Sequence, residues 1–218
     1  MAYSGQVTVG GAPDVHELSD LIISKVAVGK YNNNVYLLRC RATGEQLLID
    51  AAAEPDTLLD LVGPDGLTSV VTTHRHPDHW QALREVVAAT GARTYAGRDD
   101  VEGIPVPTDV PVDDLGTVEV GRITLTARHL VGHTPGSIAL VYDDPHGHPH
   151  IFTGDCLFPG GVGNTHEDAA AFTSLFDGVT SKLFDPLPDE TWVYPGHGDD
   201  TTLGTERPHL PEWRERGW

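Results

Sequence analysis

The feature that most constrains this chain is a short histidine-rich stretch, Thr73-His74-Arg75-His76-Pro77-Asp78-His79-Trp80. The apolar run before it, at 67–72, predicts a buried strand, and the apolar stripe after it, at 80–90, predicts a helix. The stretch therefore forms a strand-to-helix loop, which is where open α/β sheets place their binding sites. Four of its side chains have metal-ligating chemistry: His74, His76, Asp78 and His79.

The spacing of these four side chains predicts a metal site. Two histidines separated by one residue can direct both imidazoles at one ion, and the carboxylate and third imidazole beyond them can serve a second ion. The alternative is that Asp78 caps the following helix, because Asp78 and Gln81 have the spacing of a capping box. A cap explains one aspartate but not three neighbouring histidines, so we favour the metal site.

Three further candidates stand at the ends of predicted strands. His133 follows the strand at 123–129, Asp155 ends the buried strand at 150–153, and His197 follows the strand at 191–194. Each of them alone is typical of a turn. An aspartate at the end of a buried strand is costly unless it is paired or bound to a metal. Their recurrence at strand ends therefore predicts that they join the histidine-rich loop in one site.

The order of predicted elements indicates an α/β fold in a single domain over residues 1–218. Strands followed by a helix occur twice, which predicts two packed sheets with helices outside them, in four layers. Residues 1–18 are expected to form an arm or an edge hairpin, and 104–115 a long surface connection. The predicted strands are 21–28, 34–40, 46–50, 67–72, 93–96, 117–120, 123–129, 137–142, 150–153 and 191–194, and the predicted helices are 54–62, 80–90 and 167–184.

The charge balance limits the class of partner. Fourteen basic against 32 acidic residues give a formal net charge of −18. Nucleic acids and anionic membranes need clustered Lys and Arg, so we expect neither as a partner and a small-molecule substrate instead. Cys40 and Cys156 provide no disulfide framework, and the chain shows no leader peptide or membrane-spanning run, so we expect a cytoplasmic protein. The oligomeric state is left open.

The ordered motifs resemble those of a known family. His-x-His-x-Asp-His at 74–79, Gly-His-Thr-Pro-Gly at 132–136, Gly-Asp at 154–155 and Gly-His at 196–197 are similar to the signature of the metallo-β-lactamase superfamily. Residues 152–158 and 195–198 resemble its glyoxalase II-like branch, and 201–207 resembles the tail of the short bacterial members. This resemblance implies an αββα sandwich with the site at one edge of the two sheets.

The resemblance also implies a set of roles. It assigns His74, His76 and His133 to a first metal ion, Asp78, His79 and His197 to a second, and Asp155 to a bridge between them. Asp50 matches the supporting aspartate of the metal loop, although it could equally be a turn residue. Two divalent ions are expected, zinc first, with iron or manganese also compatible with mixed imidazole and carboxylate ligands.

The resulting hypothesis is a binuclear metal-dependent hydrolase that acts on a thioester of the hydroxyacyl-thiol type. Asp78 would orient the attacking hydroxide as well as ligate. The first alternative is a mononuclear iron persulfide dioxygenase that uses His74 or His79 with His133 and Asp155. Other hydrolases of the same fold, or a binding protein on an inactive scaffold, are further alternatives, and the intact ligand set disfavours the last.

The substrate pocket is predicted from the glycine-rich segment at 160–166. By the resemblance, a chain ending at residue 218 lacks the C-terminal helical domain that binds glutathione, so glutathione thioesters are expected to be poor substrates. Asn164 and His166 are candidates for the pocket wall, or else Asn164 or Thr165 is the N-cap of the next helix. We expect His146, His148 and His150 to be solvated, His129 to lie in the core or to support a ligand, and Cys156 to be a small buried residue.

Overall fold

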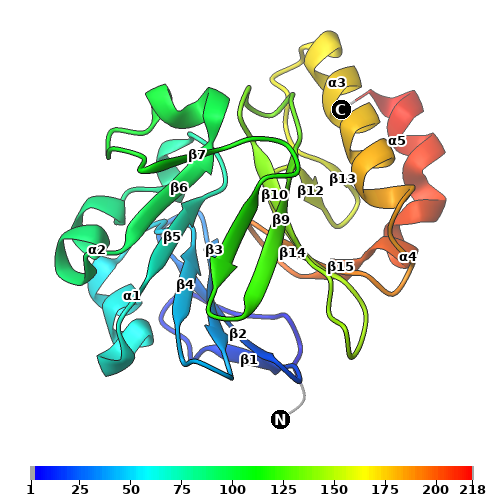
Figure 1. Cartoon of the computed structure of the whole chain (residues 1–218). Coiled ribbons are helices and arrows are strands. Elements are labelled where there is room, and N and C mark those ends of the chain that lie inside the picture. Colours follow the sequence, from blue (N-terminus) through cyan, green and yellow to red (C-terminus); the bar gives the residue numbers. More distant parts are fainter. Residues whose placement is uncertain (1–2, 218) are drawn as a thin grey trace.

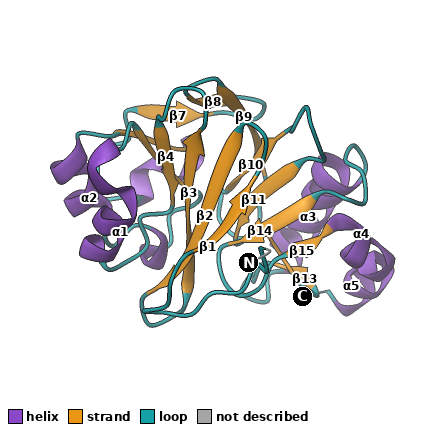
Figure 2. Ribbon diagram, turned by 90° about the horizontal axis from the view of Figure 1, so that it is seen from below, coloured by secondary structure: helices purple, strands orange, loops and turns teal. Residues whose placement is uncertain are grey.

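The computed structural model describes residues 3–217, which form two packed β-sheets with helices on both outer faces (Figures 1 and 2). The predicted four-layer αββα sandwich is confirmed. Near-continuous apolar runs such as Val35–Leu38 and Leu47–Ile49 form strands because both faces of each sheet are covered.

The first sheet contains seven strands in chain order. Pairing is antiparallel from β1 to β4 and parallel from β4 to β7. Two helices, α1 (Pro55–Val62) and α2 (Leu83–Thr90), pack on its outer face. The strands are β1 (Asp14–Glu17), β2 (Leu21–Val28), β3 (Asn33–Cys40), β4 (Gln46–Ile49), β5 (Ser69–Thr72), β6 (Arg93–Gly97) and β7 (Val110–Val112).

The second sheet has the order β15-β14-β11-β10-β9-β8, and only the β11–β14 pair is parallel. Its outer face is covered by α3 (Ala169–Val179) and α5 (Leu210–Arg216), with the short α4 (Leu203–Glu206) beside them. The strands are β8 (Thr117–Val120), β9 (Ile123–His129), β10 (Ile138–Tyr142), β11 (His150–Gly154), β14 (Trp192–Pro195) and β15 (Thr201–Thr202), and the hairpin is β12 (Leu157–Phe158) with β13 (Gly161–Val162).

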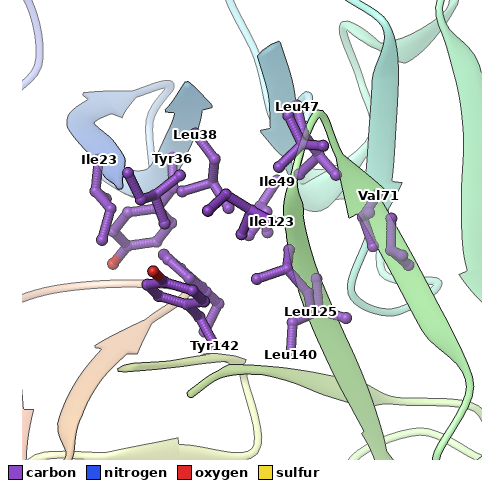
Figure 3. Packing of buried hydrophobic residues seen from close by; sticks show 14 of the residues in the cluster. Ile23, Tyr36, Leu38, Leu47, Ile49, Val71, Ile123, Leu125, Leu140 and Tyr142 are labelled. Carbon is purple, nitrogen blue, oxygen red and sulfur yellow. The ribbon is translucent and has the colours of Figure 1, made fainter. Parts of the chain in front are cut away.

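Side-chain alternation divides the interior into three apolar layers. Figure 3 shows the central layer, where Leu38 and Ile49 of the first sheet face Ile123 and Leu125 of the second. Alternate residues on the same strands point outward to the helices, as Leu37 does on β3. Burying one such side chain contributes about 1.5–3 kcal/mol, so the three layers together hold the loops at the sheet edge in place.

The structure corrects several predicted boundaries. The helix expected at 80–90 starts at Leu83, because the carbonyl of Trp80 accepts from the N–H of Leu83 in a 3₁₀-type bond, and the α-helical pattern begins with the bond from Val86 to Ala82. A 3₁₀ turn, Pro77–His79, precedes it, and Asp78 makes no capping hydrogen bond, so the capping-box alternative is wrong.

Two longer segments also differ from expectation. The connection at 104–115 contains the edge strand β7, which tolerates Pro111 because it lies at the edge of the sheet. The helix expected at 167–184 is α3 followed by a π-helical turn, Thr180–Phe184. Its N-cap is Asp168, whose Oδ1 accepts from the N–H groups of Ala170 and Ala171, so neither Asn164 nor Thr165 is the cap.

Candidate metal site

The seven predicted ligands come together at one edge of the sandwich, on loops that follow strands of both sheets. His74, His76, Asp78 and His79 follow β5 of the first sheet. The second sheet contributes the other three from the ends of β9, β11 and β14. Three overlapping groups of metal-competent atoms result, and the atoms in each lie within 4.8 Å of one another: His74, His76 and His133; His74, His79 and Asp155; and Asp78, His79 and His197.

The first of these groups, His74, His76 and His133, is called the histidine triad below. His76 Nδ1 lies 3.1 Å from His74 Nε2 and 2.9 Å from His133 Nε2, and the two Nε2 atoms are 3.2 Å apart. Zinc–nitrogen bonds of about 2.0–2.1 Å at tetrahedral angles would place such nitrogens roughly 3.3 Å apart. The triad therefore has the dimensions of three facing ligands of one ion.

The third group, Asp78, His79 and His197, is called the mixed cluster. Asp78 Oδ2 lies 3.4 Å from His197 Nε2 and 3.6 Å from His79 Nε2. Asp155 lies between the two groups, with Oδ1 3.4 Å from His79 Nε2 and Oδ2 3.7 Å from His133 Nε2. One carboxylate thus reaches both groups.

The residues present fit a metal ion. Within the described part of the chain, His79 Nε2 and Asp155 Oδ1 are buried and have no hydrogen-bond partner. Buried polar atoms are normally paired, so two unpaired atoms that face each other indicate that a further group belongs between them. A lone pair on nitrogen and a carboxylate oxygen are suitable donors for a divalent cation.

Hydrogen bonds at the far side of each ring fix which nitrogen faces the centre. His133 Nδ1 donates to the carbonyl of Asn164 (2.7 Å), and His197 Nδ1 donates to the carbonyl of Tyr31 (3.0 Å). His79 Nδ1 donates to Asp50 Oδ2 at 2.8 Å. In each of these three rings Nε2 is therefore left to bind inward, which is the arrangement that supports ligand histidines in metal proteins.

Asp50, which the resemblance identifies as a supporting aspartate, contacts the histidine-rich loop at two residues, Thr73 and His79. Its Oδ1 accepts from the N–H of Thr73 and its Oδ2 from Thr73 Oγ1, at 2.7 and 2.8 Å. Thr73 Oγ1 in turn accepts from His74 Nδ1. Asp50 thus orients His79 directly and His74 through Thr73.

Electrostatics separate the two groups. Burial lowers the pKa of His74, His76 and His133, so the triad consists of neutral imidazoles. Burial also opposes the protonation of His79, but the carboxylates of Asp50 and Asp155 outweigh it and raise its pKa to about 10. For His197, burial is likewise outweighed by the carboxylates of Asp155 and Asp78, and the pKa rises to about 9.

Comparison with known proteins agrees with this geometry. The family model described as the metallo-beta-lactamase superfamily matches residues 28–197. The chain belongs to the metallo-β-lactamase superfamily. The superfamily and the three ligand groups together support divalent metal binding.

Individual relatives place the chain near the glyoxalase II-like members of the superfamily. It is 35% identical over 182 residues to a hydroxyacylglutathione hydrolase from Polaromonas sp., a match that covers 81% of this chain and 66% of that relative. ETHE1 from Myxococcus xanthus has a similar structure, with a TM-score of 0.77, 30% identity and coverage of 88% and 84% of the two chains. TTHA1623, whose structure is of a di-iron-bound form, gives a TM-score of 0.70, 32% identity and coverage of 84% and 96%.

Within this superfamily site, glycines leave the space that the ligands occupy. A Cβ on Gly196 would lie 2.2 Å from Asp155 Oδ1 and 2.9 Å from His79 Cε1. A Cβ on Gly163 would lie 1.7 Å from the carbonyl oxygen of Asp155. Such distances are shorter than any tolerated contact, so glycine is required at Gly196 beside the carboxylate of Asp155 and at Gly163 beside its main-chain carbonyl.

Sequence reasoning missed two residues of the site. Asn33, buried on β3, donates through Nδ2 to Asp78 Oδ2 at 3.0 Å. Asp100, fully buried, accepts from the N–H of Arg75 and of Gly136 and from Thr134 Oγ1, and so joins the histidine-rich loop to the His133 loop. The run of three asparagines at 32–34 was the only sequence feature that could have indicated Asn33 as a site residue. No sequence feature indicated Asp100.

The remaining predicted residues have mixed outcomes. Asn164 and His166 border the site: Asn164 provides the carbonyl that His133 uses, and the His166 ring lies 6.2 Å from that of His76. Cys156 is buried as expected. The solvated position expected for His150 is wrong, because this residue is buried on β11, where its Nδ1 lies 3.0 Å from the Tyr194 hydroxyl. His129 is half-buried, and its Nε2 lies 2.7 Å from the carbonyl oxygen of Pro135. This contact is not with any of the predicted metal ligands.

Within residues 3–217, no helix is long and apolar enough to cross a membrane.

Proposed function

We propose that this chain is a binuclear metal-dependent hydrolase that acts on a thioester of the hydroxyacyl-thiol type. The observation that carries the proposal is the carboxylate shared between two ligand groups: Asp155 lies within 3.4–3.7 Å of ring nitrogens of His79, His133 and His197. The similarity to hydroxyacylglutathione hydrolases supports the thioester as the substrate class.

Different parts of the site would have different roles in the hydrolysis. When bound, two divalent ions would supply an acidified water and polarise the carbonyl of the substrate. Asp78 Oδ2 is held by Asn33 Nδ2 at 3.0 Å and lies 3.4 Å from His197 Nε2, so it is placed to orient the attacking water as well as to ligate. A thiolate is a good leaving group, so the reaction requires no further acid.

The identity of the ions remains part of the proposal. His74, His76 and His133 would hold one ion, and Asp78, His79 and His197 the other, with Asp155 shared. Neutral imidazoles together with carboxylates suit zinc, iron and manganese, and we propose zinc first. Chelator-treated protein reloaded with each ion in turn would identify the one that restores the highest turnover.

A cavity next to the site suggests what the substrate carries. It has a volume of about 360 Å³ and is lined by Val162, Asn164, Thr165 and Glu167. Glu167 is the one charged residue among these four, so the wall favours a neutral or cationic group over the two carboxylates of glutathione. We therefore propose that Asn164 borders a pocket for an uncharged thiol, and that His166, which lies between Thr165 and Glu167 in the chain, is near its wall.

The test is steady-state hydrolysis of a panel of hydroxyacyl thioesters, one of glutathione and others of small neutral thiols. We expect kcat/KM for the neutral thiols to exceed that for glutathione by at least about tenfold, and Glu167→Gln to narrow the gap. Efficient turnover of the glutathione thioester alone would overturn the proposed pocket for an uncharged thiol, but the proposed thioesterase activity would stand. No turnover of any thioester would overturn the thioesterase.

The second candidate is an iron-dependent persulfide dioxygenase. It is favoured by the position of Asp155, which lies 3.4 Å from His79 Nε2 and 3.7 Å from His133 Nε2, since two imidazoles and one carboxylate are the ligands of non-haem iron oxygenases. The structural similarity to ETHE1 accords with it. Oxygen consumption with a glutathione persulfide, together with one iron per chain, would establish this function in place of the hydrolase.

A further inference from the structure

Lys25 is a buried cation outside the groups described above. Its side chain has no exposed surface, although it lies on β2 among the apolar residues Leu21 and Ile23 that face the second sheet. Lysine is almost never fully buried unless its ammonium is paired. The function of the site as described above makes no use of it.

All three donors of the ammonium are used. Nζ donates to the carbonyls of Gly5 at 2.6 Å and Gly198 at 2.8 Å, and to Asp200 Oδ1 at 2.7 Å. Asp200 Oδ2 also accepts from the Tyr3 hydroxyl and from Trp192 Nε1. Two of the three acceptors of Lys25 thus belong to the segment that directly follows His197.

The chain on both sides of His197 is held to the first sheet at several points. Asn34 Nδ2 donates to the carbonyls of Pro195 and Gly198, and the Tyr36 hydroxyl donates to Pro195 as well. Gly198 itself has a φ of +74°, so the chain turns sharply just after His197. Glycine leaves such a turn flexible, so the Gly198 carbonyl helps to set the position of His197, together with the Tyr31 carbonyl that accepts from the ring. Lys25 and Asn34 are the two side chains that donate to the Gly198 carbonyl.

The supports of the histidine triad are different residues. His74 is oriented through Thr73 and Asp50, and His133 by the carbonyl of Asn164. No hydrogen bond of Lys25 reaches any of them, since its three acceptors are Gly5, Gly198 and Asp200. A change at Lys25 should therefore act on the mixed cluster and spare the triad.

We propose that Lys25 is a positioning residue for the mixed cluster: its ammonium fixes the Gly198 carbonyl and so holds His197 beside Asp78 and Asp155. This inference rests on the proposed two-ion site. Residues that orient a metal ligand typically change metal affinity by about 10- to 100-fold when they are replaced. This role depends on a contact between β2 and the loop after β14, two segments that lie far apart in the chain. No local sequence motif indicates such a contact.

The experiment titrates chelator-treated protein with Zn²⁺ by calorimetry. The variant is Lys25→Met with Asp200→Asn, because removing one charge alone would leave the other buried and unpaired. The control is Tyr3→Phe, which removes a hydrogen bond to the same Asp200 and touches neither Gly198 nor His197. Thermal unfolding followed by circular dichroism confirms that each protein is folded.

We expect two ions in the wild type. In the double variant, one ion should bind as in the wild type and the other about 10- to 100-fold more weakly. Tyr3→Phe should leave both affinities unchanged. Lys25→Gln with Asp200→Asn retains an N–H donor and should recover part of the lost affinity.

Three results would overturn the inference: equal weakening of both ions, unchanged binding of both, or a double variant that does not fold at all. Failure of the proposed function gives a different result, because a wild type that binds two ions but hydrolyses no thioester leaves the role of Lys25 intact. A wild type that binds one ion overturns both.

Discussion

The histidine triad and the mixed cluster lie side by side but are built differently. In the triad, three neutral imidazoles approach to 2.9–3.2 Å, and two of them come from a single loop. In the mixed cluster, Asp78 lies 3.4–3.6 Å from two imidazoles whose pKa values are raised to about 9 and 10. One group therefore consists of imidazoles alone, and the other combines imidazoles with a carboxylate.

Their supports differ in the same way. The triad depends on the carbonyl of Asn164 and, through Thr73, on Asp50. In the mixed cluster, by contrast, Asp78 depends on Asn33 at the start of β3, and His197 depends on the carbonyl of Tyr31 in the turn before it. The two groups should therefore be separable by substitution, except at Asp155, which both share, and at Asp50, which supports a histidine in each.

Asp155→Ala should give the largest effect, because it removes the carboxylate common to both groups. We expect turnover to fall on the order of a thousandfold, the scale on which one lost electrostatic contact in an active site acts. The fold should persist, since Asp155 lies outside the three apolar layers. Steady-state kinetics measures the turnover, and circular dichroism measures the fold. Near-normal turnover at full metal loading would contradict the role of Asp155 as a ligand shared by both groups.

Paired substitutions test whether the groups are separable. His197→Ala should reduce the metal content from two ions to one and leave the triad loaded, because His197 contributes to the mixed cluster alone. His133→Ala should remove the other ion. Elemental analysis of the dialysed proteins provides the measurement. If either variant lost both ions, or if His197→Ala lost none, the two groups would not be independent sites.

Asp50→Asn should have an intermediate effect that reaches both groups, because Asp50 orients His79 directly and His74 through Thr73. Losing such a support costs about 10- to 100-fold in metal affinity. The matched change Asp65→Asn removes a carboxylate from an exposed ion pair with Arg39 and should leave metal binding as it is. Equal affinities in both variants, measured by competition with a chelator, would rule out the supporting role of Asp50.

The smallest effect concerns a buried histidine away from both groups. Burial lowers the pKa of His150 to about 3 from 6.5, so the unfolded chain binds a proton there that the folded chain does not. The free energy of unfolding should therefore fall as pH decreases below 6.5, by about 1.5 kcal/mol between pH 6.5 and 5. His150→Phe should lack this contribution. Urea unfolding at both pH values measures it, and identical pH dependence in the two proteins would count against a neutral His150.

Much of the fold and the site could be predicted because the signals are local. Apolar runs marked the strands, and polar ligand-type residues marked their ends, so all seven predicted ligands could be found one strand at a time. The structure brings these seven together, and their roles as ligands stay a prediction that metal analysis will test.

What only the tertiary structure decided are contacts between segments far apart in the chain. Asn33 reaches Asp78, Asp100 joins two ligand loops, and Lys25 reaches Gly198 across 173 positions. Hydrophobic period and turn chemistry describe each strand separately, whereas these contacts exist only once the two sheets have packed. The sequence by itself thus determined which side chains can bind metal, and the packing of the sheets decided which residues hold them there, because a hydrogen bond between distant segments leaves no periodic trace in either one.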